Sequence, residues 1–191
     1  MKITAIYGSP RKDGNTDLLL DAYLKGISQD KHQITKFYLR DMKFSPCIEC
    51  EQCYDTGICV LEDDMKQLYP CLTDTDMLVL SSPVFFYGLN ALTKAMVDRT
   101  QCFWALKYLL KRKPSAGRKT PVKGIFLSVG GSKGKRNFEG VLLTTRYFFD
   151  ALDIDFTDHL LFQQIDNKGE INNHPTALDD ACSLAKKIID A

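Results

Sequence analysis

Short apolar runs alternate with stretches of helical periodicity along the whole chain. Runs of strand type, rich in Ile, Leu, Val and Phe, lie at residues 2–7, 33–39, 77–81, 122–129 and 154–162. Helical patterns, in which apolar residues recur three and four positions apart, lie at 17–27, 63–72, 89–110, 138–152 and 176–189. Because strands and helices alternate, the pattern predicts an α/β fold in which helices cover both faces of one parallel sheet.

Residues 1–191 are predicted to form a single domain, since this length suffices for one hydrophobic core. The predicted strands fit a flavodoxin-like, doubly wound, five-stranded parallel sheet with the order 2-1-3-4-5. In that order a ligand binds at the carboxyl ends of the first, third and fourth strands. Those ends are the segments 8–16, 82–88 and 128–134, so we expect the ligand site where they meet.

The segment 8–16 has the chemistry of a phosphate site. Its glycines let the backbone approach a ligand closely, and the helix that follows offers its N-terminal N–H groups. The polar and cationic side chains come from Ser9, Arg11, Asn15 and Thr16. The segment matches neither a P-loop nor a G-x-G-x-x-G fingerprint. The alternative is a plain helix start that Asn15 or Thr16 caps.

The other two segments suit a planar ring, which needs apolar walls and nearby backbone groups. The second segment supplies Pro83, Val84, Phe85, Phe86, Tyr87 and Gly88, and the third supplies Ser128, Gly130 and Gly131. Aromatic residues after a buried strand are more often core than cofactor site when they occur alone. Three such segments at the three expected strand ends favour a ligand site.

A cysteine loop at 46–60 contains Cys47, Cys50, Cys53 and Cys59, with the spacing C-x2-C-x2-C-x5-C. Thiolates at this spacing can converge on one soft metal centre, and four thiolates hold a [4Fe–4S] cluster. Zinc and a loop without metal are the alternatives. The remaining cysteines, Cys71, Cys102 and Cys182, are expected to be small buried hydrophobes.

The formal charge of +1 hides a basic stretch, because residues 99–138 hold eleven Lys and Arg and no acidic residue. This stretch includes a basic insertion at 101–120 and predicts an anionic partner or, alternatively, a solvated loop. We expect no nucleic-acid partner. We also expect no membrane partner, since no apolar run approaches the ~20 residues of a membrane span. The quickly polar N-terminus and the cysteine usage predict a cytoplasmic location.

Four motifs follow one another within residues 1–131. They are Gly8-Ser9-Pro10-Arg11 with Gly14-Asn15-Thr16, the four cysteines with Asp63-Asp64-Met65, Ser82-Pro83-Val84 with Lys94 and Asp98-Arg99, and Ser128 with Gly130-Gly131. In this order they resemble the NADPH-dependent FMN reductase superfamily. The cysteine run resembles its iron–sulfur flavoprotein branch.

The resemblance implies FMN, with its phosphate on Ser9, Arg11, Asn15 and Thr16 and its ring against 83–88 and 128–131. It also implies a homodimer or homotetramer and a [4Fe–4S] cluster on the four loop cysteines. Electrons would pass from NAD(P)H or a ferredoxin-type donor through FMN to a flavin, quinone or other small-molecule or protein acceptor. No side chain is assigned a catalytic role. A non-enzymatic flavodoxin-like electron carrier and a redox or metal sensor that uses the cysteine loop are the alternative functions.

Overall fold

The sheet of the computed structural model has five parallel strands in the order β2-β1-β3-β5-β6, and a short sixth strand, β4, pairs antiparallel with β3. The structure describes residues 1–28, 30–114 and 121–190. The strands are β1 (Lys2–Tyr7), β2 (Gln33–Tyr38), β3 (Met77–Phe85), β4 (Gly88–Leu89), β5 (Val122–Gly130) and β6 (Ile154–Gln163). The predicted parallel α/β sheet is therefore confirmed, whereas β4 was not predicted.

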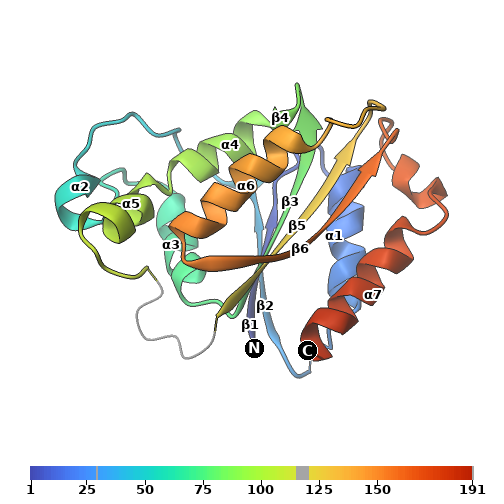
Figure 1. Ribbon diagram of the computed structural model, residues 1–191, viewed down its shortest axis with the longest axis horizontal. Helices are drawn as coiled ribbons and strands as arrows, with labels where there is room; N and C mark the ends of the chain where they lie inside the picture. The colour runs from blue at the N-terminus through green and yellow to red at the C-terminus, as the bar shows by residue number, and fades with distance from the viewer. Residues whose placement is uncertain (29, 115–120, 191) are drawn as a thin grey trace.

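Helices lie on both faces of this sheet (Figure 1). The α-helices are α1 (Asn15–Lys25), α2 (Cys53–Thr56), α3 (Met65–Thr73), α4 (Ala91–Asp98), α5 (Gln101–Trp104), α6 (Glu139–Ala151) and α7 (Ala177–Asp190). Shorter turns are η1 (Leu39–Asp41), the π-helical η2 (Ala105–Leu109) and η3 (Glu170–Asn173). Helices α1 and α7 pack together on one face, and α3, α4 and α6 lie on the other.

Alternate side chains of the strands build two separate cores. In β1, Ile3, Ala5 and Tyr7 face the core under α1 and α7, whereas Ile6 faces the core on the opposite side of the sheet. Successive strand side chains point to opposite faces, and helices cover both faces here. The strands therefore read in the sequence as nearly continuous apolar runs.

The segment 82–88, which was expected to follow the end of a strand at 77–81, instead contains the end of β3, a two-residue turn and the start of β4. Phe85 pairs with Gly88 across the hairpin. The turn residues Phe86 and Tyr87 have positive φ angles of 49° and 62°, as a type I′ hairpin turn requires. Such turns usually carry Asn and Gly, and neither residue occupies the two turn positions here. The expectation that the strand ends at residue 81 was therefore wrong.

The helical pattern at 89–110 divides into α4, α5 and η2. Both α5 and η2 pack against α2 of the cysteine loop. The first half of the predicted basic insertion at 101–120 therefore supports that loop, and residues 115–120 lie outside the described part of the chain. None of the helices in the described ranges is both long and apolar enough to cross a bilayer.

Candidate functional site

A cleft of about 130 Å³ lies at the carboxyl edge of the sheet, which is the upper edge in Figure 1. All three segments that the sequence singled out contribute to it. A fourth segment, after β6, was not predicted. The lining residues are Ser9, Pro10, Arg11, Gly14, Asn15, Thr16, Pro83, Val84, Phe85, Val129, Gly131, Ile165 and Asp166.

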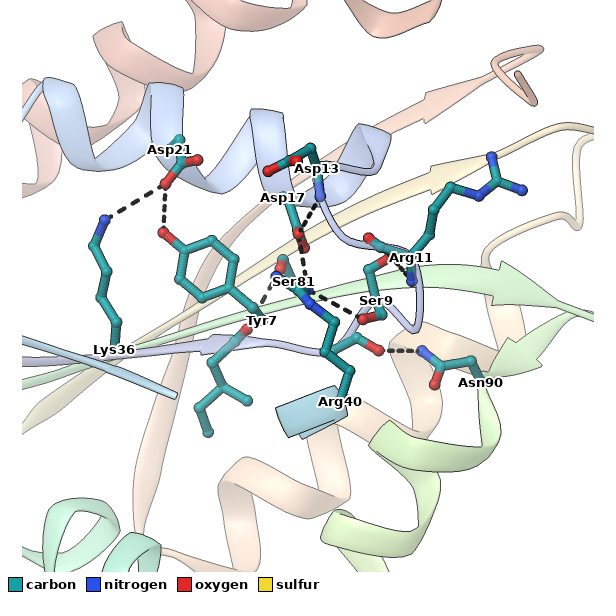
Figure 2. A network of polar contacts seen from close by, with 12 residues as sticks. Tyr7, Ser9, Arg11, Asp13, Asp17, Asp21, Lys36, Arg40, Ser81 and Asn90 are labelled. Carbon is teal, nitrogen blue, oxygen red and sulfur yellow. Dashed lines mark hydrogen bonds and ion pairs between the residues drawn. The ribbon is translucent and has the colours of Figure 1, made fainter. Parts of the chain in front are cut away.

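Gly8 fixes the point at which the first loop leaves β1. Its N–H donates to the Ser81 carbonyl at 2.8 Å, and its carbonyl accepts from Asn90 Nδ2 at 2.7 Å (Figure 2) and from Thr93 Oγ1 at 3.1 Å. A Cβ atom on Gly8 would lie 2.2 Å from Thr93 Oγ1 and 2.6 Å from the Ser81 carbonyl oxygen. Only glycine fits this position, so the loop is held tightly against β3 and α4.

Ser9 and Arg11 close the first turn of the loop. Ser9 Oγ accepts from the Arg11 N–H at 3.1 Å and donates to the Arg11 carbonyl at 3.0 Å. The Arg11 side chain is exposed, and its Nη1 donates to the Asp166 carbonyl at 3.3 Å. Figure 2 shows its guanidinium pointing away from the other polar contacts of the loop. Arg11 thus places a cation at the wall of the cleft.

Asn15 and Thr16 begin α1 at the base of the cleft. Asn15 Nδ2 donates to the Asn167 carbonyl at 2.9 Å, and its Oδ1 accepts from the Ile171 N–H at 3.2 Å. Asn15 therefore ties α1 to the segment after β6. Thr16 Oγ1, by contrast, is buried and has no hydrogen-bond partner within the described structure. A buried unsatisfied hydroxyl costs about 1–3 kcal/mol, so Thr16 marks a position where a ligand oxygen would fit.

An ion pair that sequence reasoning missed lies behind this loop (Figure 2). Arg40 of η1 places Nη1 2.8 Å from Asp17 Oδ2 and 3.3 Å from the Ser9 carbonyl oxygen. Asp17 Oδ2 also accepts from the Asp13 N–H at 3.2 Å. Burial raises the pKa of Asp17 to about 6, although Arg40 and the Asp13 N–H act in the opposite direction. The pair links the end of β2 to the loop, and neither Arg40 nor Asp17 lines the cleft.

The aromatic hairpin between β3 and β4 stands at the mouth of the cleft. Phe85 lines the cleft, and Phe86 is fully exposed, with a relative accessibility of 104%. Positive φ angles in bulky residues cost about 1–3 kcal/mol and concentrate at ligand-binding sites. The hairpin packs closely against α6. A Cβ atom added to Gly140 of α6 would lie only 2.3 Å from the Tyr87 carbonyl oxygen. An exposed aromatic surface thus lies beside the cleft and is packed against α6.

Several predicted ring contacts lie outside the lining of the cleft, namely Phe86, Tyr87, Gly88, Ser128 and Gly130. Ser128 is fully buried, and its Oγ donates to the Ser82 carbonyl at 2.7 Å. Gly130 packs tightly, since a Cβ atom there would lie 2.6 Å from Asn137 Nδ2. The side chain of Ser128 therefore joins β5 to β3, and Gly130 allows close packing beside it.

The cysteine loop forms a second, larger cavity of about 300 Å³. Cys47, Cys50, Cys53 and Cys59 all line it, together with Cys102 from α5. Glu49 and Glu51, between the first cysteines, have positive φ angles of 53° and 60°, so the chain bends sharply there. Among the described residues, no three His, Cys, Asp or Glu side chains converge closely enough to hold a single metal ion.

The cysteines outside the loop differ from one another. Cys102 is buried as expected, and burial, together with the nearby Cys59 and Cys53, raises its pKa to about 12. Cys71 and Cys182 are partly exposed, so the expectation that they are buried was wrong. Sequence reasoning gave no sign that Cys102 would join the loop cysteines, because it lies far along the chain from them.

Basic residues of the 99–138 stretch are partly neutralised within the protein. Lys107 lies 3.1 Å from Asp150 Oδ1, and Arg136 lies 2.8 Å from Glu139 Oε2. Positions 118 and 119 lie outside the described residues. These internal pairs reduce the excess charge from which an anionic partner was predicted.

Asn90 is another residue of the site that sequence reasoning missed. Its Oδ1 caps α4 by accepting two N–H groups of the first turn, while its Nδ2 reaches Gly8. An Asn directly before a helical run is a recognised start signal, so the cap was readable from the sequence. Its contact with the first loop was not readable, because the two segments meet only in the folded sheet.

The comparisons with known proteins agree with this geometry. The family model for NADPH-dependent FMN reductase matches residues 1–154. The chain belongs to this family. The sequence resemblance to it is thereby confirmed.

Relatives of two kinds resemble this family member. An iron-sulfur flavoprotein of Methanocaldococcus jannaschii is 36% identical over 101 residues, which are 53% of this chain and 52% of that protein. YwqN of Bacillus subtilis, named as an NAD(P)H-dependent FMN-containing oxidoreductase, is 24% identical over 188 residues, or 98% of each chain. The chain thus spans about half the length of iron-sulfur flavoproteins such as this one.

A solved structure of an NAD(P)H:quinone oxidoreductase from Methanothermobacter marburgensis superposes with a TM-score of 0.67 and 14% identity. The superposition covers 98% of this chain and 96% of that chain. At this level of identity the likeness shows a shared fold and no more.

Proposed function

We propose that this protein is an FMN-dependent oxidoreductase that takes electrons from NAD(P)H and passes them to a flavin, a quinone or another acceptor. The observation that carries the proposal is the buried hydroxyl of Thr16, which has no hydrogen-bond partner among the described residues and lines the same cleft as Arg11. A hydroxyl donor, a cation and the start of a helix at one point suit a phosphate group. Membership of the NADPH-dependent FMN reductase family supports the same ligand.

The size of the cleft suits the phosphate end of a flavin cofactor rather than its ring. Sites that enclose a whole small molecule measure about 300–1,000 Å³, whereas this cleft measures about 130 Å³. It therefore suits a phosphate and the chain attached to it, with the ring lying outside against the hairpin that contains Phe85. When bound, FMN would supply the hydride and electron chemistry, and the protein would supply position and electrostatics.

The chain's own residues would bind and orient the cofactor. Arg11 would neutralise phosphate charge, Thr16 would donate a hydrogen bond, and Asn15 would keep α1 in place through its contacts with residues 167 and 171. Gly131 and Val129 would let the ring approach the ends of β5. No side chain is proposed as a general acid or base.

We propose in addition that Cys47, Cys50, Cys53 and Cys59 bind one [4Fe–4S] cluster. The four thiols line one cavity of about 300 Å³, and a set of four thiolates is what a [4Fe–4S] cluster requires. The names of several relatives as iron-sulfur flavoproteins support this assignment. The cluster cavity and the cofactor cleft share no lining residue, so each group would be held independently.

The donor, assembly and location remain parts of the same proposal. A ferredoxin-type protein is the alternative donor to NAD(P)H. We propose a homodimer or homotetramer in the cytoplasm, and exposed Leu143 and Tyr147 on α6, beside the hairpin, supply apolar surface for assembly. Light scattering on the purified protein would give the assembly directly.

The function is tested by cofactor extraction and turnover. We expect chromatography of the extracted flavin to give FMN, and NADPH or NADH to reduce an added quinone in repeated cycles. Recovery of FAD as the main species would contradict the mononucleotide site. FMN without turnover would instead indicate an electron carrier.

Replacing Thr16 by Val should separate ligand binding from folding. The variant loses the hydroxyl but keeps the shape, so FMN affinity should fall roughly tenfold, the value of one hydrogen bond. The unfolding free energy of the apoprotein should stay the same or rise by up to about 1 kcal/mol, because an unsatisfied buried group is removed. Fluorescence titration and denaturant unfolding measure the two effects.

Thr145→Val is the matched control for this experiment. Thr145 Oγ1 on α6 is also buried without a hydrogen-bond partner in the described structure, but Thr145 does not line the cleft. The Thr145→Val variant should leave the unfolding free energy of the apoprotein the same or raise it slightly, as in Thr16→Val, and it should leave FMN affinity unchanged. Equal FMN affinity in Thr16→Val and the parent protein would remove Thr16 from the site.

Replacing Arg11 by Ala should weaken FMN binding by roughly tenfold or more, since a charge-assisted hydrogen bond contributes about 1.5–3 kcal/mol. The effect should shrink at high salt because the guanidinium is exposed. Lys12→Ala removes a neighbouring exposed cation that does not line the cleft, and it should have little effect. A similar loss in both variants would point to general surface charge rather than to a specific contact.

A further inference from the structure

Arg99 is a fully buried cation at the base of the cysteine loop. It is 1% exposed, and it follows α4. Its Nη1 donates to Asp63 Oδ2 at 2.6 Å and to the Ser45 carbonyl at 2.7 Å, and its Nη2 donates to Asp63 Oδ1 at 3.1 Å. Ser45 precedes the loop and Asp63 follows it. One guanidinium therefore ties the two ends of the loop together.

Arg99 also lines the cysteine cavity, whereas its ion-pair partner Asp63 does not. The cationic residue of the pair is therefore the one that borders the sulfur site. Arg99 Nε is buried and has no hydrogen-bond partner in the part of the chain that the structure describes. An arginine guanidinium stays protonated in proteins, so this side chain keeps its positive charge beside the sulfur site.

The charged residues that line the cysteine cavity in the described structure are acidic except for Arg99. Glu49, Glu51 and Asp98 line the cavity together with the cysteines. Of the lining residues that the structure describes, Arg99 is the one cation. Net charge and hydrogen bonds to sulfur set the potential of an iron–sulfur cluster. A buried cation with an unused N–H at such a site favours the reduced, more negative state.

We propose that Arg99 is a positioning residue for the sulfur site, which clamps the loop at Ser45 and Asp63 and places a buried positive charge at the wall of the cysteine cavity. It thereby raises the reduction potential of the cluster that the cysteines hold. The inference rests on the proposed cluster. It assigns a function to the Asp98-Arg99 motif, which the flavin site does not use.

The test compares cluster potentials in anaerobically purified variants. Arg99→Gln combined with Asp63→Asn removes both charges of the pair, which avoids leaving a buried carboxylate without a partner. Arg99→Lys keeps the charge at the cavity wall but loses Nε and the planar fork. Arg136→Gln with Glu139→Gln is the matched control, because it removes an exposed Arg–carboxylate pair elsewhere. Iron content, FMN content and the midpoint potential from a spectroscopic redox titration are measured for each.

We expect the Arg99→Gln, Asp63→Asn protein to retain its iron. Its equilibrium constant for one-electron reduction should fall at least tenfold, which lowers the midpoint potential of the cluster by at least about 59 mV. The Arg99→Lys protein should lie between it and the parent, and the control should match the parent. An unchanged potential with full iron content would overturn the inference and leave the cluster standing. Loss of iron from both Arg99 variants, with FMN retained, would also overturn it and leave a purely structural clamp. Absence of iron from the parent protein would overturn the cluster and this inference together.

Discussion

Protein purified without oxygen is expected to contain about four iron atoms and about four acid-labile sulfide ions per chain. Replacing Cys53 by Ser should remove most of both, because the cluster requires a set of thiolates and serine does not supply one. Cys53 lines the shared cavity and begins α2, which packs on α5 and η2, so its position is fixed by the fold. Colorimetric iron and sulfide assays and the visible absorption spectrum measure the loss.

Two comparisons make the cysteine result specific. Cys71→Ser should keep its iron, since Cys71 is partly exposed and does not line the cavity. FMN content should stay unchanged in Cys53→Ser, because the two cavities share no lining residue. Iron near zero in the freshly prepared parent protein, with four titratable thiols in the loop, would leave a plain flavin reductase. Full iron in Cys53→Ser would remove that residue from the ligand set.

Replacing Gly8 by Ala is expected to damage both stability and cofactor binding. The added methyl group would lie 2.2 Å from Thr93 Oγ1 and 2.6 Å from the Ser81 carbonyl oxygen, and a backbone atom cannot move aside cheaply. Overpacking of this kind costs about 1–3 kcal/mol of unfolding free energy. Because Gly8 also sets where the loop leaves β1, FMN affinity should fall by roughly tenfold or more. Denaturant unfolding and flavin titration measure the two losses.

Gly134→Ala provides the matched control at the same edge of the sheet. A Cβ atom on Gly134 meets no atom within 4 Å. The variant should therefore change stability by only a few tenths of a kcal/mol, as most surface substitutions do. If Gly8→Ala behaved like Gly134→Ala, the tight contact of the first loop with Ser81 and Thr93 would be wrong.

The main strands and helices could be read from the chain because their signals are local. Apolar runs and helical periodicity located β1, β5, α6 and α7 to within a residue at each end. The hairpin of β3 and β4 was missed, since its turn carries Phe86 and Tyr87 in place of the usual turn residues. Its conformation is held by strand pairing and by α6, and neither contact is visible in the local sequence.

The location of the candidate site was also predictable, because parallel strands bring their carboxyl ends to one edge. The roles of individual side chains there were less so. Asn15 was predicted to hold phosphate, and the structure shows its amide bound to the segment after β6. Thr16 was predicted only as one polar residue among several, and its burial without a partner makes it the most informative of them.

By itself, the sequence determined the α/β class, the three segments that line the cleft and the cysteine spacing, because each depends on residues close together in the chain. Only the tertiary structure decided that Arg40 pairs with Asp17, that Cys102 joins the loop cysteines and that Arg99 clamps the loop through Asp63. Each of these contacts joins segments that are distant in sequence. Their partners are chosen by the order of the strands and the packing of the helices, and no local pattern encodes that choice.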